Sequence, residues 1–178
     1  MLFPIFAFSS LLIVAHADCG FPNGTGTRLA WWQGSGKSDV QITGLKAMNE
    51  SNAIEYPILL TEPLLINIHL INNEATEWTG KAFRLSVKLW QYGGAAGCSW
   101  NEVPTFGQLD NQPACGVHVS CPLKRGEHDM YLYMPFFSTD PLISLLEDDK
   151  AYQIEFTFAD HISGHSFSVY AQARLRTK

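Results

Sequence analysis

Four cysteines are the residues of this chain whose chemistry is easiest to define. Cys115 and Cys121 lie close together in the sequence, and Pro122 and Gly126 force the chain to turn before the next extended segment. An oxidised hairpin can span this cysteine spacing. Cys98 could in principle act as a nucleophile, but pairing is favoured in a secreted chain with an even number of cysteines. These residues predict a loop that is stapled by a disulfide between Cys115 and Cys121.

Other residues that could support catalysis or metal binding form weak patterns. The sequence has no Gly-x-Ser-x-Gly elbow, no Walker loop and no His-Glu-x-x-His motif. His161 and His165 have a metal-like spacing, but they flank a glycine-containing turn, which favours solvated turn residues. Asp148 and Asp149 are adjacent, without the separate environments that acid and base catalysis needs, so we interpret them as a solvated cap. The sequence therefore predicts no enzyme, no cofactor and no metal site.

An apolar stretch at the start of the chain predicts export. Residues 2–14 are almost wholly apolar, and they lead into Ala15-His16-Ala17, a small-x-small cleavage pattern. A membrane anchor would instead need about twenty apolar residues and charged flanks. We expect residues 1–17 to be a signal peptide and residues 18–178 to form one domain, which is extracellular or in the lumen of an acidic organelle.

The residues after this cleavage site fit a secreted glycoprotein. Asn23 and Asn49 each begin an Asn-x-Ser/Thr triplet, so both are predicted glycosylation sites. Nothing after residue 17 resembles a transmembrane span. The formal charge of −5 at pH 7 argues against nucleic acid as a partner.

Apolar and polar residues alternate over most of the chain. Between Phe83 and Leu89 every second residue is apolar, as in a strand with one buried face and one solvated face. Turn-rich stretches separate such segments, which is typical of an antiparallel sandwich or barrel rather than of βαβ units. The pattern predicts about eight strands, at residues 29–33, 40–45, 54–58, 64–70, 83–89, 130–134, 152–158 and 167–175.

Two segments depart from the strand pattern. Asp140 as N-cap and Pro141 at the first helical position predict a short helix that continues through residues 142–147. Residues 92–114 form a long loop that is rich in glycine, proline and aromatic residues. Long loops in compact domains are either functional or mobile.

Several large apolar residues lie where a compact core cannot easily use them. Phe106 is in the long loop, and Phe136 and Phe137 follow a proline at the end of a strand. The predicted helix is too short to bury Leu142, Ile143, Leu145 and Leu146 on one side. These residues are compatible both with a binding pocket and with side chains that cap the end of the sandwich.

Motifs along the chain resemble those of the ML-domain lipid-recognition family. They are Asp18-Cys19-Gly20, Cys115-x5-Cys121-Pro122-Leu123-Lys124-x-Gly126-Glu127, Met134-Pro135-Phe136 and Asp149-Lys150-Ala151-Tyr152-Gln153-Ile154-Glu155-Phe156. Pro104-Thr105-Phe106-Gly107 and the Pro141 helix look more like the ganglioside-activator branch than the sterol-carrier branch. The resemblance implies an immunoglobulin-like β-sandwich whose sheets separate to admit a lipid, without catalysis.

The resemblance also implies roles for particular residues. Phe136 would stand at the mouth of the pocket and Phe106 on the loop above it, and Asp140 replaces an aromatic residue of the sterol carriers. The usual partner of Cys19 corresponds to Ser168, so Cys19 either pairs with Cys98 or both stay reduced. The lipid pocket would comprise Phe106, Met130, Leu132, Met134, Phe136, Phe137, Leu142 and Leu145.

Two functions follow from these patterns. The first is a secreted protein that holds a lipid (an acyl chain, a glycolipid or a sterol-like molecule) for transfer or presentation, possible further partners being a membrane surface or a lipid hydrolase. The alternative is a secreted sandwich with a self-filled core that binds a protein partner through Trp31 and Trp32 or through Trp100.

Overall fold

The larger of two β-sheets carries most of the chain in a computed structural model, which describes residues 19–94, 97–136 and 141–178. Its main path runs β1 (Ala30–Gln33), β10 (His165–Arg176), β9 (Lys150–Asp160), β5 (Phe83–Tyr92) and β6 (Trp100–Glu102). Two short strands join its members: β3 (Ile58–Leu59) pairs with β10 and β7 (Gln112–Pro113) pairs with β5. All of these pairings are antiparallel except that of β3 with β10.

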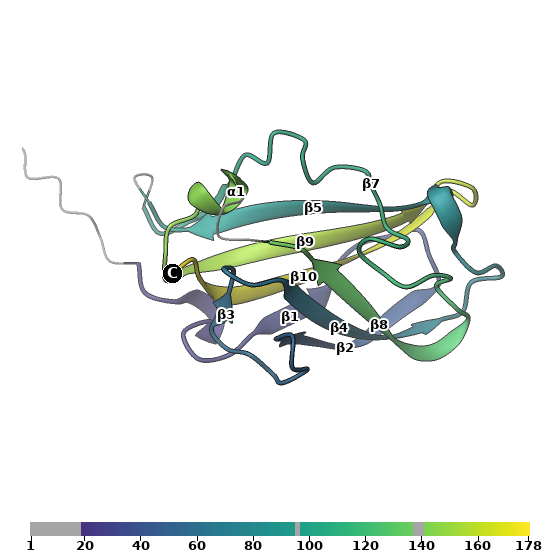
Figure 1. Cartoon of the computed structure of the whole chain (residues 1–178), viewed down its shortest axis with the longest axis horizontal. Coiled ribbons are helices and arrows are strands. Elements are labelled where there is room, and N and C mark those ends of the chain that lie inside the picture. The colour runs from purple at the N-terminus through teal and green to yellow at the C-terminus, as the bar shows by residue number, and fades with distance from the viewer. Residues whose placement is uncertain (1–18, 95–96, 137–140) are drawn as a thin grey trace, which may run out of the picture.

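The smaller sheet packs against the larger one (Figure 1). It has the order β2 (Val40–Met48), β4 (Leu64–Asn72) and β8 (Gly126–Met134), and its pairings are antiparallel. The predicted antiparallel β-sandwich with one short helix is confirmed. Two 3₁₀ turns, η1 (Pro22–Gly24) and η2 (Gly80–Ala82), complete the regular structure of the described residues.

The alternation in the sequence corresponds to the two faces of the strands. Phe83, Leu85, Val87 and Leu89 of β5 are buried, while Lys88 between them is exposed. Each strand therefore buries one row of side chains and leaves the other row to the solvent or to covering loops.

The core differs in composition between its two ends. Aromatic rings fill the end where β5 begins. The ring centroid of Phe83 lies 5.6 Å from that of Trp78 and 6.0 Å from that of Phe158, and the centroids of Phe167 and Phe158 are 5.0 Å apart. At the other end, where β5 finishes and β9 starts, aliphatic side chains such as Leu89, Ile154 and Leu175 take their place.

The observed elements differ from the predicted ones in several details. Residues 54–58 do not form a strand: Ile54 makes an isolated bridge with Met48, and only Ile58 enters β3. Pro57, next to Ile58, has no N–H to give to a ladder. Strands β6 and β7 lie within the segment 92–114 that was predicted to be a loop.

The helix α1 (Pro141–Ser144) is shorter than predicted. The amides of Leu145 and Leu146 donate to the carbonyls three residues earlier, so the α-helix tightens and ends. The predicted N-cap, Asp140, lies outside the described residues.

Two disulfides connect the described cysteines. Cys115 and Cys121 are bonded as predicted, with their Cα atoms 5.4 Å apart. Cys19 is bonded to Cys98, which is the paired alternative of the two considered. Ser168 is buried and donates its hydroxyl to the Ser35 carbonyl at 3.1 Å.

Among residues 19–94, 97–136 and 141–178, no helix has both the length and the apolar character needed to cross a membrane.

Candidate functional site

An apolar slot lies at the aliphatic end of the sandwich. The inner face of the larger sheet forms its floor through Val87, Leu89, Ile154, Phe156 and Leu175. Its roof consists of α1, the turn after α1 and three connecting loops, through Leu142, Ile143 and Leu146 and through Leu60, Leu109 and Phe136. Figure 1 shows α1 over the end of β5 that this floor belongs to. Every residue that lines the slot is apolar, so its contacts suit hydrocarbon and no polar group.

The walls of the slot nearly touch. The enclosed volume is about 20 Å³, enough for about one water molecule and far too little for an acyl chain. A larger guest therefore requires the roof to move away from the sheet. The part of the roof formed by the four-residue helix α1 and the turn after it is paired with neither sheet, so moving this part would leave the hydrogen-bonded ladders of both sheets intact.

The segment after α1, which follows the roof residue Leu146, is hydrogen-bonded to the larger sheet. The buried hydroxyl of Tyr152 lies 2.9 Å from both the Gln91 side-chain oxygen and the Glu147 carbonyl. Burial, more than the neighbouring acidic groups, raises the pKa of Tyr152, so it stays a neutral hydrogen-bond donor. This contact fixes the chain at Glu147, the residue directly after Leu146.

Asp148 and Asp149 also bond to the larger sheet, at the end of β10. They are therefore not the solvated cap that the sequence predicted. Arg174 binds both carboxylate oxygens of Asp149, at 2.6 and 2.7 Å. This hydrogen-bonded pair lowers the pKa of Asp149 and raises that of Arg174. Asp148 accepts a hydrogen bond from the Thr177 amide at 2.7 Å, which lowers its pKa. Both aspartates therefore join the segment after α1 to the end of β10.

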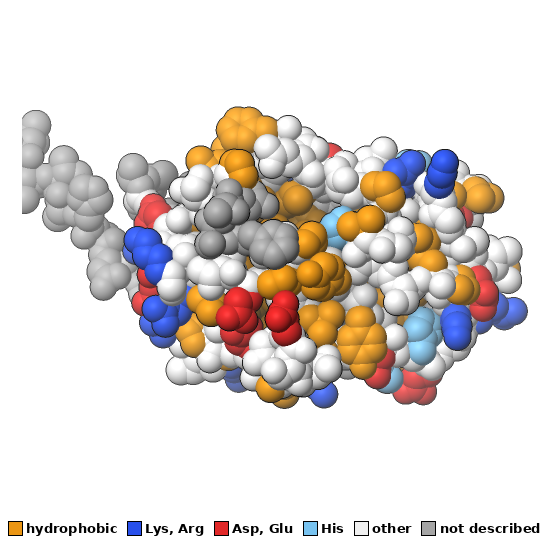
Figure 2. All heavy atoms as spheres, viewed as in Figure 1, with side chains coloured by type: hydrophobic (Ala, Val, Ile, Leu, Met, Phe, Trp, Pro, Cys, Tyr) orange, Lys and Arg blue, Asp and Glu red, His pale blue; other side chains and the backbone are white. Residues whose placement is uncertain are grey.

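The predicted pocket residues separate into three groups. Phe136 and Leu142 line the slot. Phe106 and Leu145 lie outside it, 77% and 51% exposed, on the wall of a shallow surface hollow of about 300 Å³. Figure 2 shows hydrophobic side chains gathered in the middle of the face that it presents. The remaining described members, Met130, Leu132 and Met134, are buried in the core from β8 and do not line the slot; Phe137 lies outside the described residues.

Sequence reasoning missed several residues of the slot. Leu89, Ile154 and Leu175 fall on the inward positions of predicted strands, so the alternation placed them in the interior without assigning them to a pocket. Leu60 and Leu109 come from connecting segments. No local pattern marks them, because they reach the slot only through the path of the loops.

The tryptophans of the alternative binding surface are partly covered. Trp31 is half-buried and packs against the core, while Trp32 is 39% exposed and stacks on Tyr170 with ring centroids 5.2 Å apart. A hydrogen bond with Glu155 raises the pKa of Tyr170 to about 12. Trp100 packs against Tyr92 at 5.1 Å. Of the three tryptophans, Trp32 presents the most accessible flat surface.

The two predicted glycosylation sites have different surroundings. Asn49 starts an exposed turn, and its side-chain oxygen accepts hydrogen bonds from the Ser51 and Ala53 amides. The Asn23 side-chain nitrogen, the atom to which a glycan would attach, donates to the buried Gln172 at 2.7 Å. Asn49 is therefore the more open acceptor.

The histidines of the predicted turn do not form a metal site. His165 is 2.7 Å from the Glu74 carboxylate, while His161 is exposed in the turn. Within the described part of the chain, no three His, Cys, Asp or Glu side chains are grouped so as to hold a metal ion.

Comparisons with known proteins give matches among solved structures. No family model matches the sequence, and no curated protein matches it significantly. Solved structures that match include the crystal structure of a Niemann-Pick type C2 protein from Japanese carpenter ant, with a TM-score of 0.45 and 11% sequence identity. The match covers 83% of this chain and 99% of that one. Neither a shared ligand nor a shared family follows from a likeness at this level.

Proposed function

We propose that this protein binds the hydrocarbon part of a lipid in the slot beneath α1 and holds it for transfer or presentation, without catalysing a reaction. The observation that carries the proposal is a wholly apolar slot whose roof is made of a short helix and loops. The two disulfides fit an oxidising compartment, the extracellular space or the lumen of an organelle. The sequence resemblance to the ML-domain family favours the same function; the branch of that family and the lipid class stay predictions.

Binding requires the guest to replace the contacts that the roof makes. Leu142, Ile143 and Leu146 are buried against the slot in the closed form. A lipid that buries on the order of 400 Å² of apolar surface gains about 10 kcal/mol, from which the cost of association and of roof opening is subtracted. An association cost of about 4 kcal/mol or more leaves about 6 kcal/mol at most, which corresponds to a Kd of tens of micromolar or weaker, so tighter binding requires the displaced leucines to stay in contact with the guest.

The exposed rim offers a place where a lipid could first make contact. Phe106 and Leu145 come from different segments but line one surface hollow beside the roof. Exposed apolar residues that cluster in this way are typical of sites that meet a membrane or another apolar surface. A membrane, or a lipid hydrolase to which the lipid is presented, is the partner class that this rim suits.

A second function is favoured by the closed state of the slot. An enclosed volume of about 20 Å³ means that the protein fills its own core, as expected of an interaction module that binds a protein through its surface. The stacked pair of Trp32 and Tyr170 would then be the anchor. The experiment below separates the two functions.

An uptake assay tests the lipid function. The protein is expressed in a host that secretes it, and its uptake of a fluorescent fatty acid and of a fluorescent phospholipid from vesicles is measured. Phe136→Asp places a charge in the slot wall, and Leu145→Asp places one on the exposed rim, where it is compatible with folding. We expect Phe136→Asp to abolish uptake and Leu145→Asp to slow it, because a charge in an apolar contact must be desolvated.

Trp32→Ala is the matched control, since it removes an exposed aromatic residue that does not line the slot. It should load lipid as the unaltered protein does. Circular dichroism verifies that each variant is folded. Equal uptake by the unaltered protein and by folded Phe136→Asp, with no lipid in organic extracts of the purified protein, would leave the interaction module as the better function.

A further inference from the structure

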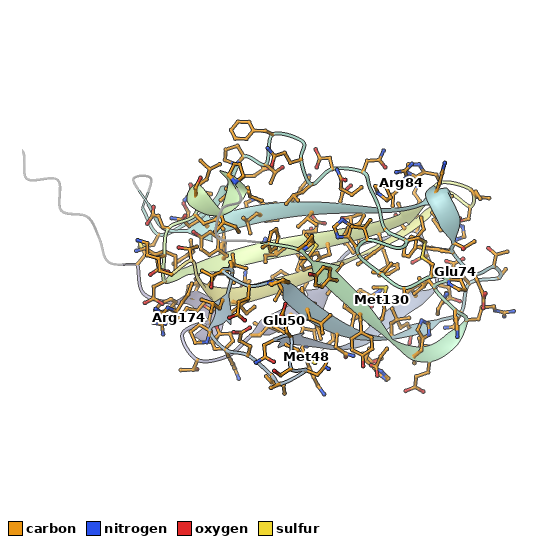
Figure 3. The ribbon with its side chains drawn as sticks, in the orientation of Figure 1. Met48, Glu50, Glu74, Arg84, Met130 and Arg174 are labelled. Carbon is orange, nitrogen blue, oxygen red and sulfur yellow. A yellow bond between two sulfur atoms is a disulfide. The ribbon has the colours of Figure 1, made fainter. Side chains whose placement is uncertain are left out.

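A second hollow, unrelated to the slot, lies on the outer face of the smaller sheet. It has a volume of about 370 Å³ and is lined mainly by side chains that point away from the core on β2, β4 and β8. The strand register places Lys46, Asn67 and Tyr131 in one row across the three strands, and Gly44, His69 and Asp129 in the next row. We call this hollow the outer groove. Figure 3 labels Met48, another residue of its lining, near the lower edge of the molecule.

The groove is deep because Gly44 contributes no side chain to it. Gly44 follows an irregularity in the pairing of β2 with β4, and it lies opposite His69. A Cβ atom at this position would stand 3.3 Å from the His69 Cβ. The absence of a side chain at position 44 therefore opens a recess between the flanking residues.

Asn67 is the residue that most strongly points to a ligand. It is 9% exposed, it lines the groove, and its side-chain amide makes no hydrogen bond with any described residue. Neither amide atom is among the fully buried polar atoms that lack a partner, so both face the open space of the groove and can bond to a molecule that enters it. Here both the oxygen and the nitrogen of the amide are left for a molecule in the groove.

The charges around the groove favour an uncharged, hydroxyl-rich ligand. The His69 ring nitrogens are each 3.0 Å from a carboxylate, one of Asp129 and one of Glu127, so the protonated ring and the two carboxylates together carry one net negative charge. Lys46 adds one positive charge at the edge. With donors and acceptors of both kinds and no excess of one sign, the groove has little to attract a phosphate or another strong anion.

Tyr131 supplies a flat apolar wall beside these polar groups. It is 47% exposed on β8, directly across from Asn67 in the register. A tyrosine ring offers an apolar face to a neutral ring that has C–H groups on one side and hydroxyls at its edge. A hollow that combines one such face with a few convergent polar groups is typical of small-molecule binding.

We propose that the outer groove binds a pyranose ring of a carbohydrate, with its C–H face on Tyr131 and its hydroxyl groups bonded to the Asn67 amide and the Asp129 carboxylate. The ring belongs either to a free or protein-linked glycan or to the head group of a glycolipid. Because the groove shares no residue with the slot, this proposal goes beyond lipid binding and does not depend on it.

Saturation-transfer NMR and amide chemical-shift mapping with methyl glycosides of glucose, galactose, mannose and N-acetylglucosamine test the site. We expect one or more to bind in the millimolar range and to shift the Asn67 side-chain amide signals. Tyr131→Ala and Asn67→Leu should each weaken binding by about tenfold or more. The matched control is Tyr133→Ala, which removes an exposed tyrosine from the same face of β8 without touching the lining of the groove.

Co-sedimentation with phosphatidylcholine vesicles, with and without glucosylceramide or galactosylceramide, distinguishes the two sources of the sugar. Binding of methyl glycosides indicates a soluble glycan, and binding that needs the glycosylceramide indicates a glycolipid; either must be lost in both groove variants. Absence of binding in both assays, or binding that survives in folded Tyr131→Ala and Asn67→Leu, overturns the proposal.

Discussion

Arg174 and Asp149 form a two-point ion pair that ties the segment after α1 to the last strand. The Arg174 Nε donates to one carboxylate oxygen at 2.6 Å and a terminal guanidinium nitrogen donates to the other at 2.7 Å. The same guanidinium lies 4.8 Å from the centre of the Phe21 ring, and the Arg174 amide donates to the Tyr56 hydroxyl. Figure 3 labels Arg174 at the end of the sandwich at which Figure 1 shows α1. One arginine thus holds together three segments beside the roof of the slot.

Removing this ion pair should destabilise the protein in a pH-dependent way. Asp149→Asn keeps a residue that tolerates the left-handed backbone at this position, where φ is 60°, but it removes the charge. The lowered pKa of Asp149 means that its contribution is present above the ordinary value of 3.8 and is lost as the pH falls through the lower folded value. We expect a lower melting temperature for the variant at pH 7 and convergence with the unaltered protein in strong acid.

Thermal unfolding followed by circular dichroism between pH 2 and pH 8 measures this effect. Asp110→Asn is the control, because Asp110 is exposed in a loop away from the ion pair. A constant difference in melting temperature over the whole pH range would contradict the assignment. Because the pKa of Asp149 is below 3.8, the ion pair with Arg174 persists at pH 5, and acidification of an organelle to that pH would not break it.

His69 should show the opposite pH dependence. Its hydrogen bonds to Asp129 and Glu127 raise its pKa above 6.5, so the protonated form is favoured in the folded state. The stability that this cation contributes is complete below pH 6.5 and is lost as the pH rises through the higher folded value. His69→Gln should therefore reduce stability near pH 5 and have little effect near pH 9.

Proton NMR titration of the histidine rings checks this directly, with His161→Gln as the control in an exposed turn. A His69 midpoint at or below 6.5 would show that the two carboxylates do not hold the cation.

The two disulfides should differ in their effect on stability. Cys19–Cys98 closes a separation of 79 residues, whereas Cys115–Cys121 closes one of 6. In the chain-entropy model the longer loop is stabilising by about 4.5 kcal/mol and the shorter by about 2 kcal/mol. Two double variants, one with Cys19 and Cys98 replaced by serine and one with Cys115 and Cys121 replaced by serine, can be compared by urea unfolding. The free energy of unfolding should fall more in the first.

Peptide mapping without reduction should give the same two linkages in the unaltered protein. If the two serine variants lose the same amount of stability, residual structure in the unfolded chain, and not the length of the closed loop, determines how much each disulfide stabilises the protein.

The sequence by itself determined the features that depend on neighbouring residues. Alternation over Phe83 to Leu89 identified β5 and its buried face, because the side chains of a strand change sides at every residue. The spacing of Cys115 and Cys121 likewise identified the short disulfide. The length of α1 was misjudged because local preference is weak beside the packing that ends so short a helix.

The tertiary structure alone decided which residues from distant segments meet. The slot joins Leu60 and Leu109 to Leu175, and the outer groove joins Gly44, Asn67 and Tyr131 across three strands. These sites depend on strand register and on loop paths, which are set by long-range packing and hydrogen bonding. A local pattern in the chain does not contain that information, because a shift of one residue in register turns every side chain of a strand to the other face.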